Sequence, residues 1–211
     1  MARTFVELFR IDGFEGLSMA GRTDQWIFTE LAGRHGVATD AATVERIRDT
    51  YLTHLRREIH EPGPAKRILP GVEALLDALT ARDDVFVALL TGNIQQGAKI
   101  KLEFFDLWRY FPCGGFGDAA TDRPGLLVEA LAAVEAHAGC SFHATDIVIV
   151  GDTPLDVSVA IGAGAHALAV ATGSFDERVL REAGADTVLP DLSDIARVMA
   201  TIDGGTAEAE R

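Results

Sequence analysis

Long hydrophobic runs, basic residues and cysteines are all scarce in this 211-residue sequence. The longest apolar runs span about six residues, whereas a membrane-spanning helix needs roughly 18, and the N-terminus does not resemble a signal peptide. Lysines and arginines number 19 against 32 aspartates and glutamates, which gives a formal net charge of −13. Such a surface repels phosphate backbones and anionic membranes. We therefore expect a cytoplasmic protein with no nucleic-acid or membrane partner.

Zinc and disulfide chemistry are also disfavoured. The two cysteines, Cys113 and Cys140, form no C-x-x-C pair, and the six histidines show no H-E-x-x-H spacing. Hydrophobic residues make up 48% and charged residues 24% of the chain, which is ordinary globular composition. The sequence therefore predicts a globular protein with reduced thiols, and it leaves the oligomeric state open.

The first third of the chain has the periodicity of helices. Thr23 is a plausible N-cap for a helix over residues 24–35, which Gly36 would end, and residues 41–60 follow an amphipathic 3.6-residue period. Residues 61–70 hold three prolines and a glycine, which break regular structure. We therefore expect a small α-helical lobe over residues 1–69.

The pattern then changes to short apolar runs that alternate with helical stretches. The runs cover residues 85–90, 147–150, 167–170 and 187–189, and the helical stretches cover 93–105, 124–138, 154–162 and 175–183. Strands that are apolar on both faces and alternate with helices are typical of a parallel sheet covered on both sides. The sequence predicts a doubly wound, Rossmann-like α/β domain over residues 70–203, followed by a disordered tail over 204–211.

Polar residues follow two of these runs, where ligands bind in such folds. Asp152 and Asp156 follow the run that ends at residue 150, and carboxylate oxygens suit Mg²⁺. A simple Asp cap explains Asp152 equally well, whereas Asp156, four residues on, is harder to explain as a cap. Thr91, Gly92 and Asn93 follow the run that ends at residue 90. They offer a hydroxyl, a bare amide and a side-chain amide for a phosphate, with an Asn93 N-cap as the simpler alternative.

Four segments together resemble motifs of the haloacid dehalogenase superfamily, and its phosphoglycolate-phosphatase-like branch in particular. They are Val87-Ala-Leu-Leu-Thr-Gly-Asn93, Phe116-Gly-Asp118, Asp122-Arg-Pro124 and Val148-Ile-Val-Gly-Asp-Thr-Pro-Leu-Asp156. Gly21-Arg-Thr-Asp24 resembles the substrate-facing loop of that branch's α-helical cap. The resemblance therefore implies that residues 1–69 form the cap and residues 70–203 the hydrolase core.

The resemblance also implies roles for individual residues. Thr91 would hydrogen-bond the transferring phosphoryl group, Asp152 would ligate Mg²⁺ and Asp156 would support the metal shell. Arg123 would be the cation of the third motif, in place of the family's usual lysine. Lys101 is a competitor that ranks lower, because it lies about 12 Å along the helix axis from Asn93 at 1.5 Å per residue. The residues expected to bind substrate are Gly92, Asn93, Arg22 and Thr23.

The family's nucleophile motif, D-x-D-G-T, is absent from the printed sequence. One interpretation is a degenerate motif, with a strand over residues 4–9 and Arg10 at the nucleophile's position. The favoured interpretation makes Phe5, Leu8 and Phe9 part of a cap helix, with the native product starting upstream of Met1. The resemblance implies that the family's first strand lies between the strands that end at residues 90 and 150. Without it, those two strands would lie about 9.6 Å apart with unpaired edges, which is costly.

We therefore expect a Mg²⁺-dependent hydrolase of small phosphorylated metabolites that works through an aspartyl phosphate. Residues 1–211 by themselves should be inactive, because they lack the nucleophile. A rival hypothesis is a catalytically inactive phosphate-binding or protein-interaction module. A second rival is a 2-haloacid dehalogenase, which needs no metal and which the Asp152/Asp156 pair disfavours.

Overall fold

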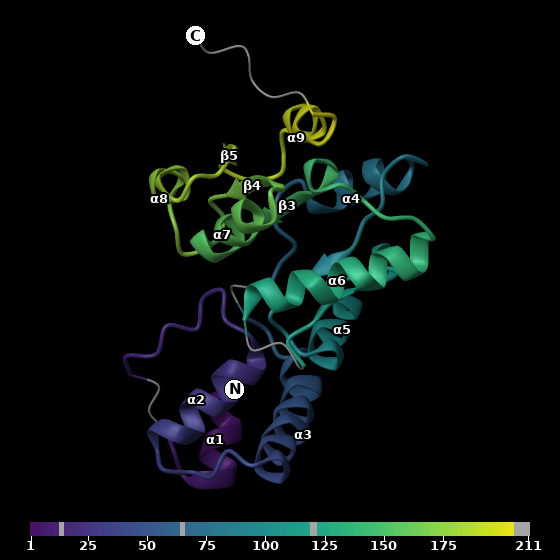
Figure 1. The fold of residues 1–211 in the computed structure, drawn as a ribbon. Helices are drawn as coiled ribbons and strands as arrows, with labels where there is room; N and C mark the ends of the chain where they lie inside the picture. The colour runs from purple at the N-terminus through teal and green to yellow at the C-terminus, as the bar shows by residue number, and fades with distance from the viewer. Residues whose placement is uncertain (13–14, 64–65, 119–121, 205–211) are drawn as a thin grey trace. The chain divides into compact units, whose positions relative to one another are not determined.

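The computed structural model describes residues 1–12, 15–63, 66–118 and 122–204, and the chain forms two compact units (Figure 1). Residues 1–66 and 89–131 form the first unit, and residues 67–88 and 132–211 form the second. The first division falls inside the proline-rich segment 61–70. The proposed limits of cap and core remain predictions, and residues 205–211 of the expected tail lie outside the described residues.

Three helices build the apolar core of the first unit. They are α1 (Ala2–Phe9), α2 (Asp24–Arg34) and α3 (Ala41–Glu58), and they share a cluster that includes Phe5, Phe28 and Ile47, all fully buried. Helix α1 ends at Phe9, and its C-cap residue Arg10 has a left-handed backbone with φ of 62°. The alternative strand over residues 4–9 is therefore wrong, because the apolar side chains there have helical spacing and pack against α2 and α3.

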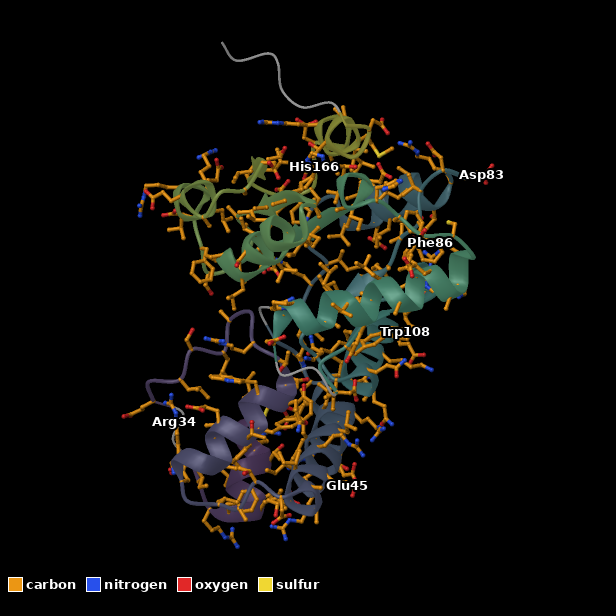
Figure 2. All side chains as sticks on the ribbon, in the orientation of Figure 1. Arg34, Glu45, Asp83, Phe86, Trp108 and His166 are labelled. Carbon is orange, nitrogen blue, oxygen red and sulfur yellow. The ribbon has the colours of Figure 1, made fainter. Side chains whose placement is uncertain are left out.

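The rest of the first unit begins with a short parallel sheet. Strand β1 (Leu89–Leu90) pairs with β2 (Gly114–Gly115), and α5 (Gln95–Phe104) and the 3₁₀-helix η1 (Trp108–Tyr110) connect them. Trp108, labelled in Figure 2, has its ring centroid 6.1 Å from that of Phe116, just after β2. Helix α6 (Arg123–Ala138) begins in this unit. The strand expected over residues 85–90 is thus confined to its last two residues.

The second unit holds a three-stranded parallel sheet in the order β3-β4-β5. Its elements are α4 (Val72–Thr80), η2 (Ala144–Asp146), β3 (Val148–Gly151), α7 (Pro154–Ala163), β4 (His166–Val170), α8 (Glu177–Glu182), β5 (Thr187–Leu189) and α9 (Ile195–Ile202). Leu168 and Val170 of β4 pack in one cluster with residues of α4 and α9. Because side chains alternate along a strand, the buried Ala167 and Ala169 face the other side, and α7 also packs on β3 and β4.

Every strand pairing among the described residues is parallel, and helices cover both faces of the sheet in the second unit. These features confirm the predicted α/β fold class. Helices α4 and α9 lie where no helix was predicted. No helix in the described part of the chain is both long enough and apolar enough to cross a membrane.

Candidate functional site

The Thr91–Asn93 loop follows β1 directly and is held by hydrogen bonds on several sides. The backbone N–H of Thr91 donates to Gly115 O at 3.1 Å, next to β1's partner strand. The Asn93 side chain donates through Nδ2 to Thr91 Oγ1 at 2.8 Å, and the Asn93 backbone N–H donates to the same oxygen at 3.2 Å. The Lys101 ammonium donates to Asn93 Oδ1. The Thr91 hydroxyl therefore has a defined place and defined partners.

Two other segments lie against this loop at backbone-contact distance. The N–H of Asp24 donates to Gly92 O at 2.6 Å, and the N–H of Gly117 donates to Asn93 O at 2.8 Å. A Cβ on Gly92 would lie 2.4 Å from Arg22 O, and a Cβ on Gly117 would lie 2.1 Å from Gly92 O. Glycine at both positions allows the loop to fit between residues 21–24 and residues 117–118.

Two carboxylates cap the helix that follows the loop. Asp24 Oδ2 accepts from the N–H of Ile94 at 2.9 Å, and Asp118 Oδ2 accepts from the N–H of Gln95 at 2.6 Å. Ile94 is the N-cap residue of α5, so the alternative of an Asn93 N-cap is wrong. The first amides of α5 already have anionic partners, so an added phosphate would need nearby cations.

Lys101 is closer to the loop than the sequence suggests. Its Cα lies two turns into α5, yet its ammonium reaches Asn93. The 12 Å estimate that ranked it below Arg123 counted the rise between backbones only. Side chains in a helix lean toward the N-terminus, and the four-carbon stem of a lysine spans the remaining distance.

Burial shapes the electrostatics around this cluster. It raises the pKa of the Asp24 carboxyl above its ordinary value, and the positive charge of Lys101 and the hydrogen bond from Ile94 offset part of that rise. Burial also lowers the pKa of the Lys101 ammonium, which the negative charge of Asp24 offsets in part. Both groups shift toward their neutral forms, because the loss of hydration outweighs their mutual attraction.

The candidate cap loop at residues 21–24 also carries the predicted substrate-binding residues. The hydroxyl of Thr23 caps α2 by accepting from the N–H of Trp26 at 3.1 Å, as its position predicted. The guanidinium of Arg22, an exposed residue, lies 4.6 Å from the centroid of the Trp26 ring. Arg123 Nε donates to Gly21 O at 2.9 Å. The same loop therefore contacts both the Thr91–Asn93 loop and the predicted cation of the third motif.

In the second unit, the end of β3 presents Asp152 and Asp156. Asp156 Oδ2 accepts from the N–H of Thr153 at 3.1 Å and from its hydroxyl at 2.8 Å, while Thr153 Oγ1 accepts from the N–H of Asp156 at 3.3 Å. This reciprocal pair is a capping box at the start of α7. The expectation that Asp156 is hard to explain as a cap is therefore wrong.

The Asp152 carboxylate lies beside the loop that follows β4. A Cβ on Gly173 would lie 2.2 Å from Asp152 Oδ2, so glycine there gives the carboxylate its space. Adjacent parallel strands present their following loops at the same sheet edge, which explains this proximity. Asp152 is only partly buried, which leaves part of it open to solvent.

Ligation of Mg²⁺ by Asp152 remains a prediction, and the residues at the end of β3 offer it one carboxylate, with Asp156 holding the loop that carries Asp152. Mg²⁺ takes one or two carboxylates together with water and phosphate oxygens, so this donor set suits it. Within the described ranges, no group of three or more His, Cys, Asp or Glu side chains is placed to hold a metal. Direct ligation by Asp156 remains a prediction.

The structure brings some predicted residues together and leaves others separate. Gly92, Asn93 and Thr91 contact residues 21–24 or each other within the first unit, and Arg123 contacts Gly21 there. Asp152 and Asp156 belong to the second unit, and their roles at a metal remain predictions.

Sequence reasoning missed the parts played by Asp24 and Asp118. Both stand in segments that the motif comparison had singled out, but neither was chosen as a site residue. The sequence signals were weak: Asp24 directly follows the N-cap Thr23, and Asp118 ends its motif. An acidic residue in either position is usually a solvated carboxylate.

Comparison with known proteins points to the same superfamily as the motifs. Residues 123–195 match the model of the HAD-hydrolase-like family. No curated protein matches the chain.

Solved structures share the fold over most of the chain. A hydrolase from Pseudomonas syringae has 20% identity and a TM-score of 0.68, with 95% of this chain and 89% of that chain covered. A phosphonoacetaldehyde hydrolase-like protein from Oleispira antarctica has 18% identity and a TM-score of 0.68, with 99% and 88% covered. A protein from Haemophilus somnus, described as a predicted phosphoglycolate phosphatase, has 15% identity and a TM-score of 0.62, with 85% of this chain and 79% of that chain covered. The family match over residues 123–195 and the shared fold confirm the resemblance to hydrolases of the haloacid dehalogenase superfamily.

Proposed function

We propose that this chain contributes the phosphate-binding and magnesium-binding groups of a hydrolase that acts on phosphomonoesters of small metabolites. The Thr91–Asn93 loop carries the proposal. It places a threonine hydroxyl, fixed by two hydrogen bonds from Asn93, directly after a parallel strand. Ligands in α/β folds bind at this position. The family match and the shared fold support the same reaction class.

In the proposed site, the hydroxyl of Thr91 donates to an oxygen of the phosphoryl group. Arg123 offsets the negative charge of the phosphate. A cation is needed because Asp24 and Asp118 already occupy the first amides of α5. In the second unit, Asp152 would hold Mg²⁺, and Asp156 would keep the Asp152 loop in shape through its capping box. When bound, the ion would supply Lewis-acid chemistry.

Substrate choice is assigned to the loop at residues 21–24. Arg22 is exposed and its guanidinium lies over the Trp26 ring, which restrains a cation that could contact an anionic substrate. A small metabolite with a second negative group, of which phosphoglycolate is one example, has the chemistry to match. The name of the Haemophilus somnus structure agrees with this class.

The printed chain contains no D-x-D-G-T string, and neither Arg10 nor Asp12 can supply the missing pair of carboxylates. Arg10 is the C-cap residue of helix α1, and its guanidinium cannot attack phosphorus. Aspartyl-phosphate chemistry needs a carboxylate nucleophile and an acid that protonates the leaving oxygen. We therefore expect no phosphatase activity from residues 1–211 alone.

The test compares residues 1–211 with a chain in which a D-x-D-G-T strand precedes residue 1. Turnover of p-nitrophenyl phosphate and phosphoglycolate is measured with Mg²⁺, and Asp152→Asn controls for contaminating phosphatases. We expect turnover only in the extended chain and its loss in Asp152→Asn. Activity of the short chain that disappears in Asp152→Asn would show that another residue is the nucleophile. Phosphate binding without turnover in either chain would favour an inactive binding module, and chloride release from a 2-haloacid without Mg²⁺ would favour a dehalogenase.

A further inference from the structure

The Asn93 side chain lies between Thr91 and Lys101 and bonds to both. Its Nδ2 donates to Thr91 Oγ1 at 2.8 Å, and its Oδ1 accepts from the Lys101 ammonium. The Asn93 backbone N–H adds a second hydrogen bond to Thr91 Oγ1 at 3.2 Å. The Thr91 oxygen therefore accepts both of these hydrogen bonds and donates neither.

The donors and acceptors of Asn93, Lys101 and Thr91 determine how these side chains can be oriented. An asparagine amide could turn over and exchange its oxygen for its nitrogen, but an ammonium has only donors and requires the oxygen to face it. Lys101 thus fixes which end of the amide faces Thr91. A threonine hydroxyl has two acceptor sites and one hydrogen. With its lone pairs directed at Asn93, its hydrogen is left to donate to another group.

We propose that Lys101 is a positioning residue, which locks the Asn93 amide so that the Thr91 hydroxyl can only donate to a phosphoryl oxygen. This inference rests on the proposed function, in which Thr91 binds the phosphate. Without the ammonium, the amide can turn over and present Oδ1 to Thr91. The hydroxyl then donates to Asn93, and a phosphoryl oxygen meets a lone pair instead of a hydrogen.

The surroundings of Lys101 support a fixed position. The residue is only partly exposed, and its ammonium interacts electrostatically with the carboxylate of Asp24. Asp24 is itself buried and is held by the N–H of Ile94. The backbone N–H of Asp24 also donates to Gly92 O, inside the loop that carries Thr91. One set of contacts therefore joins residues 21–24, Lys101 and the Thr91 hydroxyl.

A different role would make Lys101 a direct partner of the phosphate. In that case its loss and the loss of the Thr91 hydroxyl would remove two separate contacts, and their effects would add. In the positioning role both changes remove the same hydrogen bond, so the double variant would lose no more than one single variant. A double-mutant cycle therefore separates the two roles.

The experiment uses the full chain and inorganic phosphate, with Mg²⁺ present throughout, and measures affinity by calorimetry. The variants are Thr91→Val, Lys101→Met, their combination and Lys101→Arg. Lys99→Met is the matched control, because Lys99 is an exposed residue of the same helix, 3.7 Å from Glu103, and its loss changes the net charge equally. The NMR signals of the Asn93 side-chain amide report its orientation, and circular dichroism confirms folding. If Lys101→Met does not fold, Lys101→Gln replaces it.

We expect Thr91→Val and Lys101→Met each to weaken phosphate binding by about tenfold, the size of one charge-assisted hydrogen bond. The double variant should bind no more weakly than either single variant, and Lys101→Arg and Lys99→Met should stay within about threefold of the wild type. The Asn93 amide signals should move in Lys101→Met. Additive losses, or unmoved amide signals, would overturn the positioning role alone. Unchanged affinity in Thr91→Val would overturn the phosphate role of Thr91, and this inference with it.

Discussion

Gly92→Ala tests the close approach between the Thr91–Asn93 loop and residues 21–24. An alanine Cβ would lie 2.4 Å from Arg22 O, 3.0 Å from Arg22 C and 3.1 Å from Thr23 Cα. Since ordinary contacts begin near 3.4 Å and all three atoms are backbone, no side-chain rotation can relieve the overlap. The two segments must separate by about 1 Å. A forced shift of this kind in a well-packed site is the cause of overpacking costs.

The expected loss of stability has two parts. Overpacking of a well-packed site costs about 1 to 3 kcal/mol. Separation also weakens the 2.6 Å hydrogen bond from the N–H of Asp24 to Gly92 O, at a cost of about 1 kcal/mol. The free energy of unfolding should therefore fall by about 2 to 4 kcal/mol.

Gly33→Ala is the matched control. Gly33 lies in α2, and a Cβ there meets nothing within 4 Å. Alanine is favoured over glycine in a helix by about 0.5 to 1 kcal/mol, so this variant should be slightly more stable than the wild type. The same chemical change is thus expected to have opposite signs at the two positions.

Urea unfolding followed by circular dichroism measures both effects, with midpoints compared at similar slopes. Gly92→Ala should lower the midpoint by about 1 M or more, at a typical slope of 1 to 3 kcal/mol per molar urea. A Gly92→Ala variant within about 0.5 kcal/mol of the wild type would refute the described contact between the two loops, because surface changes away from such contacts stay in that range.

Four further predictions concern other parts of the chain. Thr153→Ala should lower the free energy of unfolding by about 1 kcal/mol because it removes the cap of α7, whereas Thr153→Ser should keep it; equal urea midpoints would contradict the capping box. Phe5→Ala should lower the free energy of unfolding by about 3 to 5 kcal/mol, because this fully buried ring packs α1 into the apolar core of the first unit. A loss below about 1 kcal/mol would argue against the position of α1. The pKa of Lys101 is lower in the folded chain than its ordinary value of 10.5. Between the two pKa values the unfolded chain holds more protons than the folded chain, so a rise in pH favours folding. The stability of the wild type relative to Lys101→Met should therefore rise with alkaline pH, and a difference that falls would reverse the assignment. Mg²⁺ should bind residues 1–211 more weakly than micromolar, because Asp152 supplies one carboxylate and Asp156 Oδ2 is engaged by Thr153; micromolar affinity by calorimetry that survives Asp152→Asn would show that the ligands lie elsewhere.

Much of the local structure could be predicted from the sequence. The N-cap at Thr23, the helix that follows it and the amphipathic helix α3 lie close to where their patterns predict. Three of the four expected strands are present with bounds shifted by at most about one residue, which is ordinary variation in assigning element ends. These features depend on side chains within a few residues of each other, which is the range that periodicity and capping report.

The weaker predictions fail where local signals are short or absent. Strand β1 is reduced to Leu89–Leu90, and α4 and α9 formed where no pattern was recognised. Both helices pack their apolar side chains into the core around β4 and β5. The presence of a helix there is decided by burial against the sheet as well as by helix propensity.

The residue pattern alone was enough to predict the alternation of strands and helices, the superfamily resemblance and the loop that carries Thr91. What surrounds that loop depends on the folded chain. Asp24 caps an amide 70 residues away, Asp118 caps one 23 residues away, and Lys101 reaches back along its helix to Asn93. A carboxylate or ammonium in a sequence is solvated by default. Its partner is set by which distant backbone groups folding brings within hydrogen-bond distance, and no local pattern records that.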